Sequence, residues 1–426
     1  MADNPQRAYR SLRHRDFRLL WFADAVSMLG TQMQRVAIGW QVYELTGDPL
    51  QLGLLGLVRF LPVLLFGIVG GVIADQRDRR VILLASISVL AASSITLAVM
   101  AWTDSASMPL IYGISFFSAA VSAVAGPSRQ ALFPALVPRA ELAGAATMNI
   151  LAMQTAGVTG PALGGVIIGI GGLGLTYALD AVSFGAVLIA LLLMRARPDV
   201  PPLQVTGFAA AREGLQFLWG MPILLAVMSL DFFATFFGAS TTLLPIFAEE
   251  VFGMGARGYG LLVSAPAAGA VLGSLVMSVL PIPRRVGLGI VVAVAAYGAC
   301  LLGFGLSQTI WLSLLLLAGS GAADTVSMAF RHTIRNLVTP DQLRGRIAAA
   351  HSTFAMGGPQ LGEFEAGLIA ASFGSPFSVA SGGAATIIAC LAVVRLVPSI
   401  ARYRTDSPET EVEGRTQEPR ATAAKT

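Results

Sequence analysis

Long apolar stretches, separated by short polar segments, repeat along almost the whole chain. A helix needs about twenty consecutive apolar residues to cross a bilayer, and these stretches reach that length. The breaks between them fall at glycines, prolines and clusters of charge. The pattern predicts an all-α polytopic membrane protein with twelve transmembrane helices, at residues 17–43, 50–74, 81–102, 108–129, 143–169, 174–194, 222–248, 257–280, 286–306, 309–330, 347–371 and 374–397.

The twelve predicted spans divide into two pseudo-symmetric halves of six. The connection between spans 4 and 5 reads LVPRAELAGA (136–145), and that between spans 10 and 11 reads LVTPDQLRGR (337–346). Parallel six-helix repeats of this kind are typical of one large transporter architecture. The predicted segments are a cytoplasmic N-terminal segment (1–16), an N-terminal six-helix half (17–195), a cytoplasmic linker (196–221), a C-terminal six-helix half (222–398) and a disordered cytoplasmic tail (399–426).

Basic residues alternate from loop to loop. Of the 28 Lys and Arg residues, all but Arg35, Arg59 and Arg257 fall on one side of the membrane when the spans are laid out. Because cytoplasmic loops carry the excess of Lys and Arg, both termini are predicted to be cytoplasmic. Arg257 suits an ordinary loop on the other side. Arg35 and Arg59 lie inside spans 1 and 2, where the insertion rule does not explain them.

Composition narrows the class of protein further. Hydrophobic residues make up 55% of the chain and charged residues only 12%, too little charge to keep a soluble protein's surface wet. The arginines lie in short loops rather than on one face, which argues against nucleic acid as a partner. Lys425 is the single lysine, so the chain lacks the Gly-Lys pair of a Walker-type phosphate loop. The spacing of the three histidines fits no metal motif, and we expect neither an enzyme nor a cofactor.

The loop between spans 2 and 3 carries a recognisable pattern, GVIADQRDRR (71–80). It resembles the loop motif of the major facilitator superfamily, G-x-x-x-D-[RK]-x-G-[RK]-[RK]. The residues that match are Gly71, Asp75, Arg79 and Arg80. Gln76 stands in place of a basic residue and Asp78 in place of the second glycine. The resemblance implies a cytoplasmic gate, in which the carboxylate pairs with arginines in one conformation and releases them in the other.

Span 5 contains a run of small residues and a proline that resembles the G-P-x-x-G-G motif of the exporter branch of the superfamily. The residues that carry it are Gly157, Gly160, Pro161, Gly164 and Gly165. The upstream glycine of the family motif falls on Ala156, one position from Gly157. Glycine and proline here allow tight helix packing and a local kink. The match favours export over uptake.

The resemblance extends over nearly the whole chain. YALDAVSF in span 6 and the stretch from GAADTVSMAFRHTIRNL to LGEFEAG (321–367) are similar to the facilitator subgroup that includes the bacterial enterobactin exporter and related efflux permeases. This similarity implies the major facilitator fold and secondary active export driven by the proton gradient. It also implies a multi-pass protein of the bacterial inner (plasma) membrane, and it leaves the substrate open.

Ionisable residues inside the spans are costly unless they are paired or solvated, which makes them candidates for function. The candidates for proton coupling or the substrate cavity are Asp24, Arg35, Arg59, Asp231, Asp324, Glu363 and Glu365, with Asp180 as a further buried carboxylate. A carboxyl group in an apolar cavity can hold a proton at neutral pH and release it to water or a cation. Asp24, Asp231, Glu363 and Glu365 are therefore our candidates for proton coupling.

Alternative roles stay open for several of these groups. A fixed ion pair that orients helices carries equal weight for Asp24 and Asp324. We expect Arg59 either to contact an anionic substrate or to pair with a cavity carboxylate. Arg331, near the cytoplasmic end of span 10, is expected to extend toward the membrane surface rather than to contact substrate.

The leading hypothesis is a transporter that exports a small organic molecule, siderophore-like or drug-like, by proton antiport. One six-helix half would rock against the other around a midplane cavity. Its partners would be that substrate, protons and membrane lipid, and we expect a monomer. Proton-coupled uptake of an organic anion and a non-transporting receptor or scaffold are the alternatives, and the cost of the buried charges argues against a scaffold.

Overall fold

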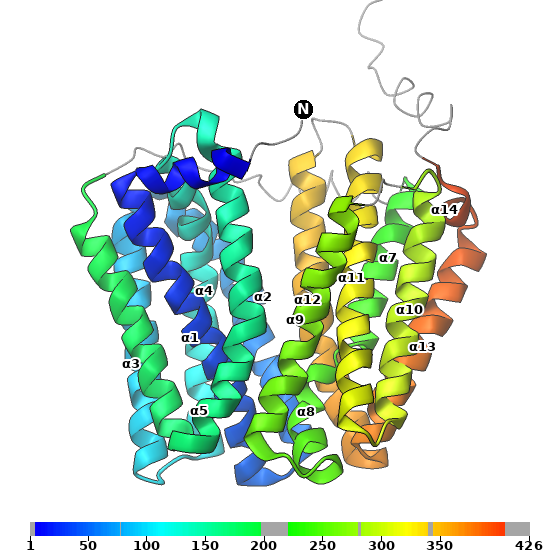
Figure 1. The fold of residues 1–426 in the computed structure, drawn as a ribbon, viewed down its shortest axis with the longest axis horizontal. Coiled ribbons are helices and arrows are strands. Elements are labelled where there is room, and N and C mark those ends of the chain that lie inside the picture. The colour runs from blue at the N-terminus through cyan, green and yellow to red at the C-terminus, as the bar shows by residue number, and fades with distance from the viewer. Residues whose placement is uncertain (1–4, 77, 197–219, 280–282, 340–343, 405–426) are drawn as a thin grey trace, which may run out of the picture.

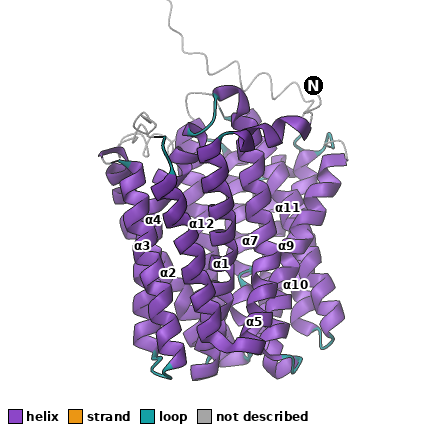
Figure 2. Cartoon of the chain, turned by 60° about the vertical axis from the view of Figure 1, so that its left-hand side comes forward, coloured by secondary structure: helices purple, strands orange, loops and turns teal. Residues whose placement is uncertain are grey.

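The computed structural model describes residues 5–76, 78–196, 220–279, 283–339 and 344–404 (Figure 1). Within these ranges the side chains of 5–8, 67–76, 240, 344–346 and 348–356 lie outside the description. The described chain is helical, with short loops and no strand among these residues (Figure 2). The tail 405–426 and most of the linker predicted at 196–221 fall outside it.

The first half begins with a short 3₁₀ helix, η1 (Pro5–Arg13), and continues as long helices. These are α1 (Arg15–Thr46), α2 (Pro49–Gln76), α3 (Arg79–Trp102), α4 (Met108–Ala135) and α5 (Leu142–Leu193), with the turn η2 (Arg139–Glu141) before α5. Helix α5 is interrupted at Gly172, whose φ of 74° is left-handed and readily adopted by glycine. Its 52 residues therefore form two spans.

The second half repeats this arrangement with a broken first span. Its elements are α7 (Pro222–Phe237), η3 (Ser240–Leu243), α8 (Leu244–Ile246), η4 (Phe247–Val251), α9 (Gly255–Val279), α10 (Val286–Leu306), α11 (Ile310–Val338), α12 (Arg344–Phe373), α13 (Ser375–Leu396) and α14 (Ser399–Arg402). The segments from α7 to η4 follow one another as a single apolar stretch, Pro222–Val251. Together they make the seventh span.

The described residues contain nine helical stretches long and apolar enough to cross a membrane. One of them, Arg139–Leu193, holds both arms of α5 and so accounts for two spans. Helices α1 and α12, with 32 and 30 residues, supply the remaining two. Both carry several of the charged candidates, which explains their lower hydropathy. The twelve-span architecture expected from the sequence is confirmed.

The apolar cores show where the halves meet. One core joins residues of both halves near the helix ends opposite the termini, including Trp40, Leu52, Phe247 and Phe304. Near the face that carries the termini, here called the terminal face, the cores are separate. Phe17 belongs to a core built from the first half, whereas the cores around Val286 and Leu224 are built from the second. The halves therefore close together at the face opposite the termini (Figure 1).

Two glycine-mediated helix contacts hold this closure. Between α2 and α12, a methyl group added at Gly53 would meet the backbone of Gly367. Between α5 and α9, a methyl group added at Gly165 would meet the backbone of Gly260. Small residues let helix backbones approach closely in membranes. Each contact joins one half to the other.

Candidate functional site

Charged and phenolic side chains meet where the two halves close. Arg35 of α1 and Arg59 of α2 interact electrostatically with Glu363 of α12, and Arg59 also with Tyr177 of α5 and Tyr259 of α9. We call these five residues the interface cluster. Three of its residues come from the first half and two from the second, so the cluster exists only while the halves are together.

Local sequence makes room for the interface cluster. Gly56 lies against Glu363, and a methyl group there would meet the Glu363 carboxylate. Gly39 lies against Tyr259, and a methyl group there would meet the Tyr259 hydroxyl group. The Tyr259 ring stacks on Trp40 with centroids 6.0 Å apart. A larger residue at either glycine would therefore displace a polar group of the cluster.

The two arginines of the cluster are available to a ligand. The Arg35 side chain is exposed although it lies in the middle of a spanning helix, and its Nη1 donates a hydrogen bond of 3.1 Å to Gln32 Oε1. Within the described part of the chain, neither Arg35 nor Arg59 forms an ion pair with a carboxylate. A guanidinium that forms no direct ion pair is suited to bind a carboxylate or phenolate.

A second charged site lies inside the first half. Asp24 of α1 is buried and pairs with Arg129 of α4, with 2.5 Å between Asp24 Oδ2 and Arg129 Nη2. The sequence places Asp24 on the same helix face as Arg35, eleven residues away, but the structure gives it a partner on another helix. Arg129 is the last residue of predicted span 4, where the alternation of basic residues from loop to loop explains it without a partner.

A third charged site lies inside the second half and corrects the expectation for Arg331. Arg331 of α11 is buried, with 5% of its surface exposed, and does not extend to the membrane surface. Its Nη1 lies 3.0 Å from Asp231 Oδ1 of α7, and its Nη2 donates to Asp324 Oδ1 at 3.1 Å. The neighbouring Asp231 carboxylate attracts the guanidinium inward, which a pattern within one helix cannot reveal.

Asp180 has a different environment from the other buried carboxylates. It is fully buried, and its Oδ2 accepts a hydrogen bond of 2.7 Å from Ser94 of α3. Ser94 in turn accepts a bond of 2.8 Å from Gln34 of α1. Asp180 forms no ion pair with any described residue. The group links three helices through neutral hydrogen bonds.

Glu365 contrasts with Glu363, two residues before it on α12. It is partly exposed, and no ion pair or hydrogen bond of its side chain is found within the described ranges. Glu363 belongs to the interface cluster. Residues two apart on a helix point in different directions, in agreement with the different surroundings of the two carboxylates.

The gate motif is described only in part. Arg79 is buried, and the Arg80 guanidinium donates to the backbone carbonyl of Leu192 at 3.1 Å. Asp78, which replaces the second glycine of the family motif, caps α3 by accepting a hydrogen bond of 2.9 Å from the backbone N–H of Arg80. The side chains of Gly71 and Asp75 lie outside the described part, so the pairing of Asp75 stays a prediction.

The exporter-type motif forms a junction of three helices. A methyl group at Gly160 would meet Gln32, and one at Gly164 would meet the backbone of Met33, so these glycines seat α5 on α1. Gly165 and the backbone carbonyl of Pro161 both lie against Gly260 of α9. Gly157 is less constrained, since a methyl group there would make ordinary contact with Ala267. The motif therefore supports both the first half and its closure on the second.

No group of three or more His, Cys, Asp or Glu side chains within the described residues is placed to hold a metal ion. The chemistry that these sites offer is ion pairing, hydrogen bonding and proton exchange.

Comparison with known proteins agrees with the fold. The family model described as transmembrane secretion effector matches residues 6–419. The enterobactin exporter EntS of Citrobacter koseri is 26% identical over 395 residues, covering 93% of this chain and 95% of the relative. EntS of Salmonella typhimurium is 25% identical over 397 residues, with the same coverage of 93% and 95%.

Solved structures share the architecture at low sequence identity. A bacterial homologue of the human lysosomal transporter Spinster, in an inward-facing and occupied conformation, matches with a TM-score of 0.67 and 15% identity, covering 97% of this chain and 98% of that one. A transporter of the POT family in complex with a thioalcohol-conjugated peptide matches with a TM-score of 0.71 and 12% identity, covering 91% and 96%. These likenesses bear on the fold alone.

Proposed function

The chain belongs to the transmembrane secretion effector family of major facilitator transporters, and from that premise we propose that it exports a small organic molecule in exchange for protons. Its relatives are named as exporters of enterobactin, which supports export and a siderophore-like or drug-like substrate. Small molecule, proton and lipid are the proposed partners, with the chain acting as a monomer.

The interface cluster is the observation that carries the proposal. Arg35 and Arg59 belong to the first half, and Glu363 belongs to the second. When Glu363 is ionised, its attraction to the arginines favours the closed interface between the halves. When Glu363 takes up a proton, that attraction is lost, and the arginines become free for an anionic group of the substrate. The Glu363 carboxylate and an anionic group of the substrate thus compete for the same two arginines, so protonation of Glu363 and substrate binding are linked through one set of charges.

The orientation follows from the arrangement of basic residues. We propose that the terminal face is cytoplasmic, because the loops there carry most of the arginines. The halves close at the opposite face, so this conformation would admit substrate from the cytoplasm. Opening would then require separation of the contacts at Gly53–Gly367 and Gly165–Gly260.

Everted membrane vesicles test the coupling directly. Radiolabelled enterobactin and an anionic fluorescent dye serve as probes, and respiration supplies the proton gradient. We expect accumulation of at least one probe in vesicles with the unaltered protein, and loss of proton-driven accumulation with Glu363→Gln. Glu365→Gln is the matched control, since it removes the same charge two residues away and outside the cluster. Equal accumulation with both variants would contradict the assignment of Glu363.

A second arm of the same experiment tests direction and the role of the arginines. Arg59→Gln is expected to weaken transport of an anionic probe more than that of an uncharged analogue. Accumulation of the probe in right-side-out vesicles, and none in everted ones, would replace export by proton-coupled uptake of an organic anion.

A further inference from the structure

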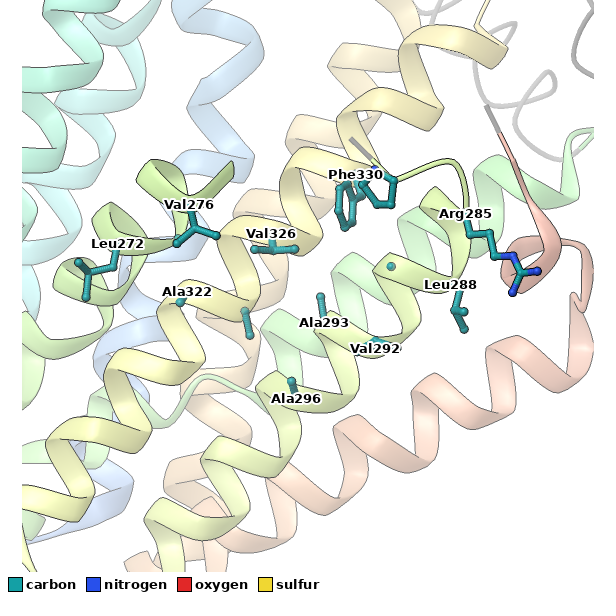
Figure 3. A pocket seen from close by; sticks show the side chains of 14 residues that line it. Leu272, Val276, Arg285, Leu288, Val292, Ala293, Ala296, Ala322, Val326 and Phe330 are labelled. Atoms are coloured by element: carbon teal, nitrogen blue, oxygen red, sulfur yellow. The ribbon is translucent and has the colours of Figure 1, made fainter. Parts of the chain in front are cut away.

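A groove of about 590 Å³ runs along the outer surface of the second half, between α9, α10 and α11. Figure 3 shows the side chains of these three helices that line it, among them Leu272, Val276, Val292 and Val326. Leu272, Val276 and Val292 are more than half exposed. Since all three helices span the membrane, these side chains face hydrocarbon rather than water. The groove shares no residue with the interface cluster and does not depend on the proposed function.

Small residues keep the groove open. Ala293 and Ala296 of α10 and Ala322 of α11 line it, where longer side chains would fill the space. Gly289 lets the ring of Phe330 lie against α10, since a methyl group at Gly289 would meet that ring. Close approach of α9 to α11 at Gly273 and Ala322 fixes the other wall. The packing thus leaves a slot between the three helices.

A single charge marks one end of the groove. Arg285 is the one charged residue among the described residues that line it. It immediately precedes α10, at the terminal face, where the backbone N–H of Gly287 bonds to Tyr403. The Arg285 guanidinium has no ion-pair partner within the part of the chain that the structure describes. In the corresponding loop of the first half, the Arg80 guanidinium is bonded to a backbone carbonyl.

We propose that this groove is a binding site for an anionic phospholipid of the leaflet at the terminal face. One acyl chain lies along the apolar slot, and the phosphate of the headgroup meets Arg285. The pairing of an apolar slot with one cation at its membrane-surface end matches the two parts of such a lipid. A peptide or a second copy of the chain would fill the slot without needing the cation.

Phe330 gives the site a connection to the interior. Its ring lines the groove, and the next residue, Arg331, holds Asp231 and Asp324. A bound acyl chain therefore supports α11 at the turn that positions the charged site of the second half. We expect the lipid to stabilise that half.

Lipid retention in native mass spectrometry tests the site. The full-length protein is purified from nanodiscs that contain equal amounts of phosphatidylglycerol and phosphatidylcholine. We expect one retained phosphatidylglycerol, and a loss of preference over phosphatidylcholine of about fivefold in Arg285→Gln, the effect of one basic side chain near an anionic surface. Arg395→Gln, which removes another exposed arginine near the terminal face outside the groove, is the control and should keep the preference.

A filling variant tests the slot separately. Ala296 is exposed, so Ala296→Phe can occupy the groove without disturbing the core, and circular dichroism checks that the variant is folded. We expect it to lower retention of both lipids. The proposal is overturned if Arg395→Gln lowers the preference as much as Arg285→Gln, if Ala296→Phe leaves retention unchanged, or if the groove is covered by a second copy, seen as a dimer that Ala296→Phe dissociates.

Discussion

In the first half one buried carboxylate meets one arginine, Asp24 with Arg129, whereas in the second half Asp231 and Asp324 share the guanidinium of Arg331. Both sites lie between the first and fourth spans of their half, as pseudo-symmetry requires. The first is balanced in charge and reaches solvent through Arg129, whose side chain is 39% exposed. In the second, two carboxylates contact one guanidinium, which is buried.

This difference indicates different tasks for two related positions. A balanced pair can fix the orientation of α1 against α4 with no change of protonation. Two carboxylates beside one guanidinium repel each other, and binding of a proton to one of them relieves the repulsion. Arg335 interacts electrostatically with Asp231, and Tyr297 interacts with Asp324. The second half therefore holds the better site for a proton away from the interface cluster.

Removal of Arg331 or Arg129 is expected to give the largest difference in stability between the two charged sites. Arg331→Met leaves the buried Asp231 beside Asp324, whose side chain is 43% exposed, without their shared guanidinium, and loss of one partner of a buried pair such as Arg331–Asp231 costs about 3–5 kcal/mol. Arg129→Met leaves one carboxylate and removes a side chain that already reaches solvent, where ion pairs contribute less. Thermal unfolding of the purified variants in detergent measures both. A greater loss of stability in Arg129→Met would reverse the assignment of tasks.

Neutralisation of a single carboxylate in each half compares the contribution of the two charged sites to proton-driven transport. Asp231→Asn leaves a balanced pair of Arg331 and Asp324, so the protein should fold while proton-driven accumulation in everted vesicles falls to the level of uncoupled vesicles. Asp24→Asn removes a fixed pair and should retain more of the accumulation. Passive movement of the same probe down its gradient is the control, because it reports transport without coupling. If Asp24→Asn abolishes accumulation and Asp231→Asn does not, the proton site away from the interface cluster lies in the first half.

The contrast between the halves also shows what the sequence can predict. The spans follow from apolar length, and the charged residues inside them stand out because burial is costly. The i to i+7 spacing of Asp324 and Arg331 places them on one stripe, and the structure confirms their contact. The breach of the positive-inside pattern by Arg35 and Arg59 singled out two residues that the structure brings together at the interface.

Partners on other helices could not be found in this way. The contact of Arg129 with Asp24 spans four helices in sequence, and that of Arg331 with Asp231 depends on how α7 packs against α11. Such contacts are set by the rotation and depth of each helix in the bundle, which hydrophobic periodicity fixes only loosely. The position of an arginine near a loop is likewise a poor guide to its partner. Arg129 and Arg331 both lie near predicted span ends, yet each pairs with a carboxylate inside the bundle.

Asp180 provides the smallest effect and the most direct control on the comparison, since it is a buried carboxylate of the first half that has no arginine partner among the described residues. Its bond from Ser94 and its full burial are compatible with a carboxyl group that keeps its proton. Asp180→Asn preserves shape and the acceptor for Ser94, so we expect a change in stability of about 1 kcal/mol or less. Asp180→Ala removes the acceptor and leaves Ser94 and Gln34 without it, at a cost of about 1–3 kcal/mol. Thermal unfolding of the two variants separates these outcomes, and a loss in Asp180→Asn as large as in Asp180→Ala would mean that the carboxylate is ionised and paired.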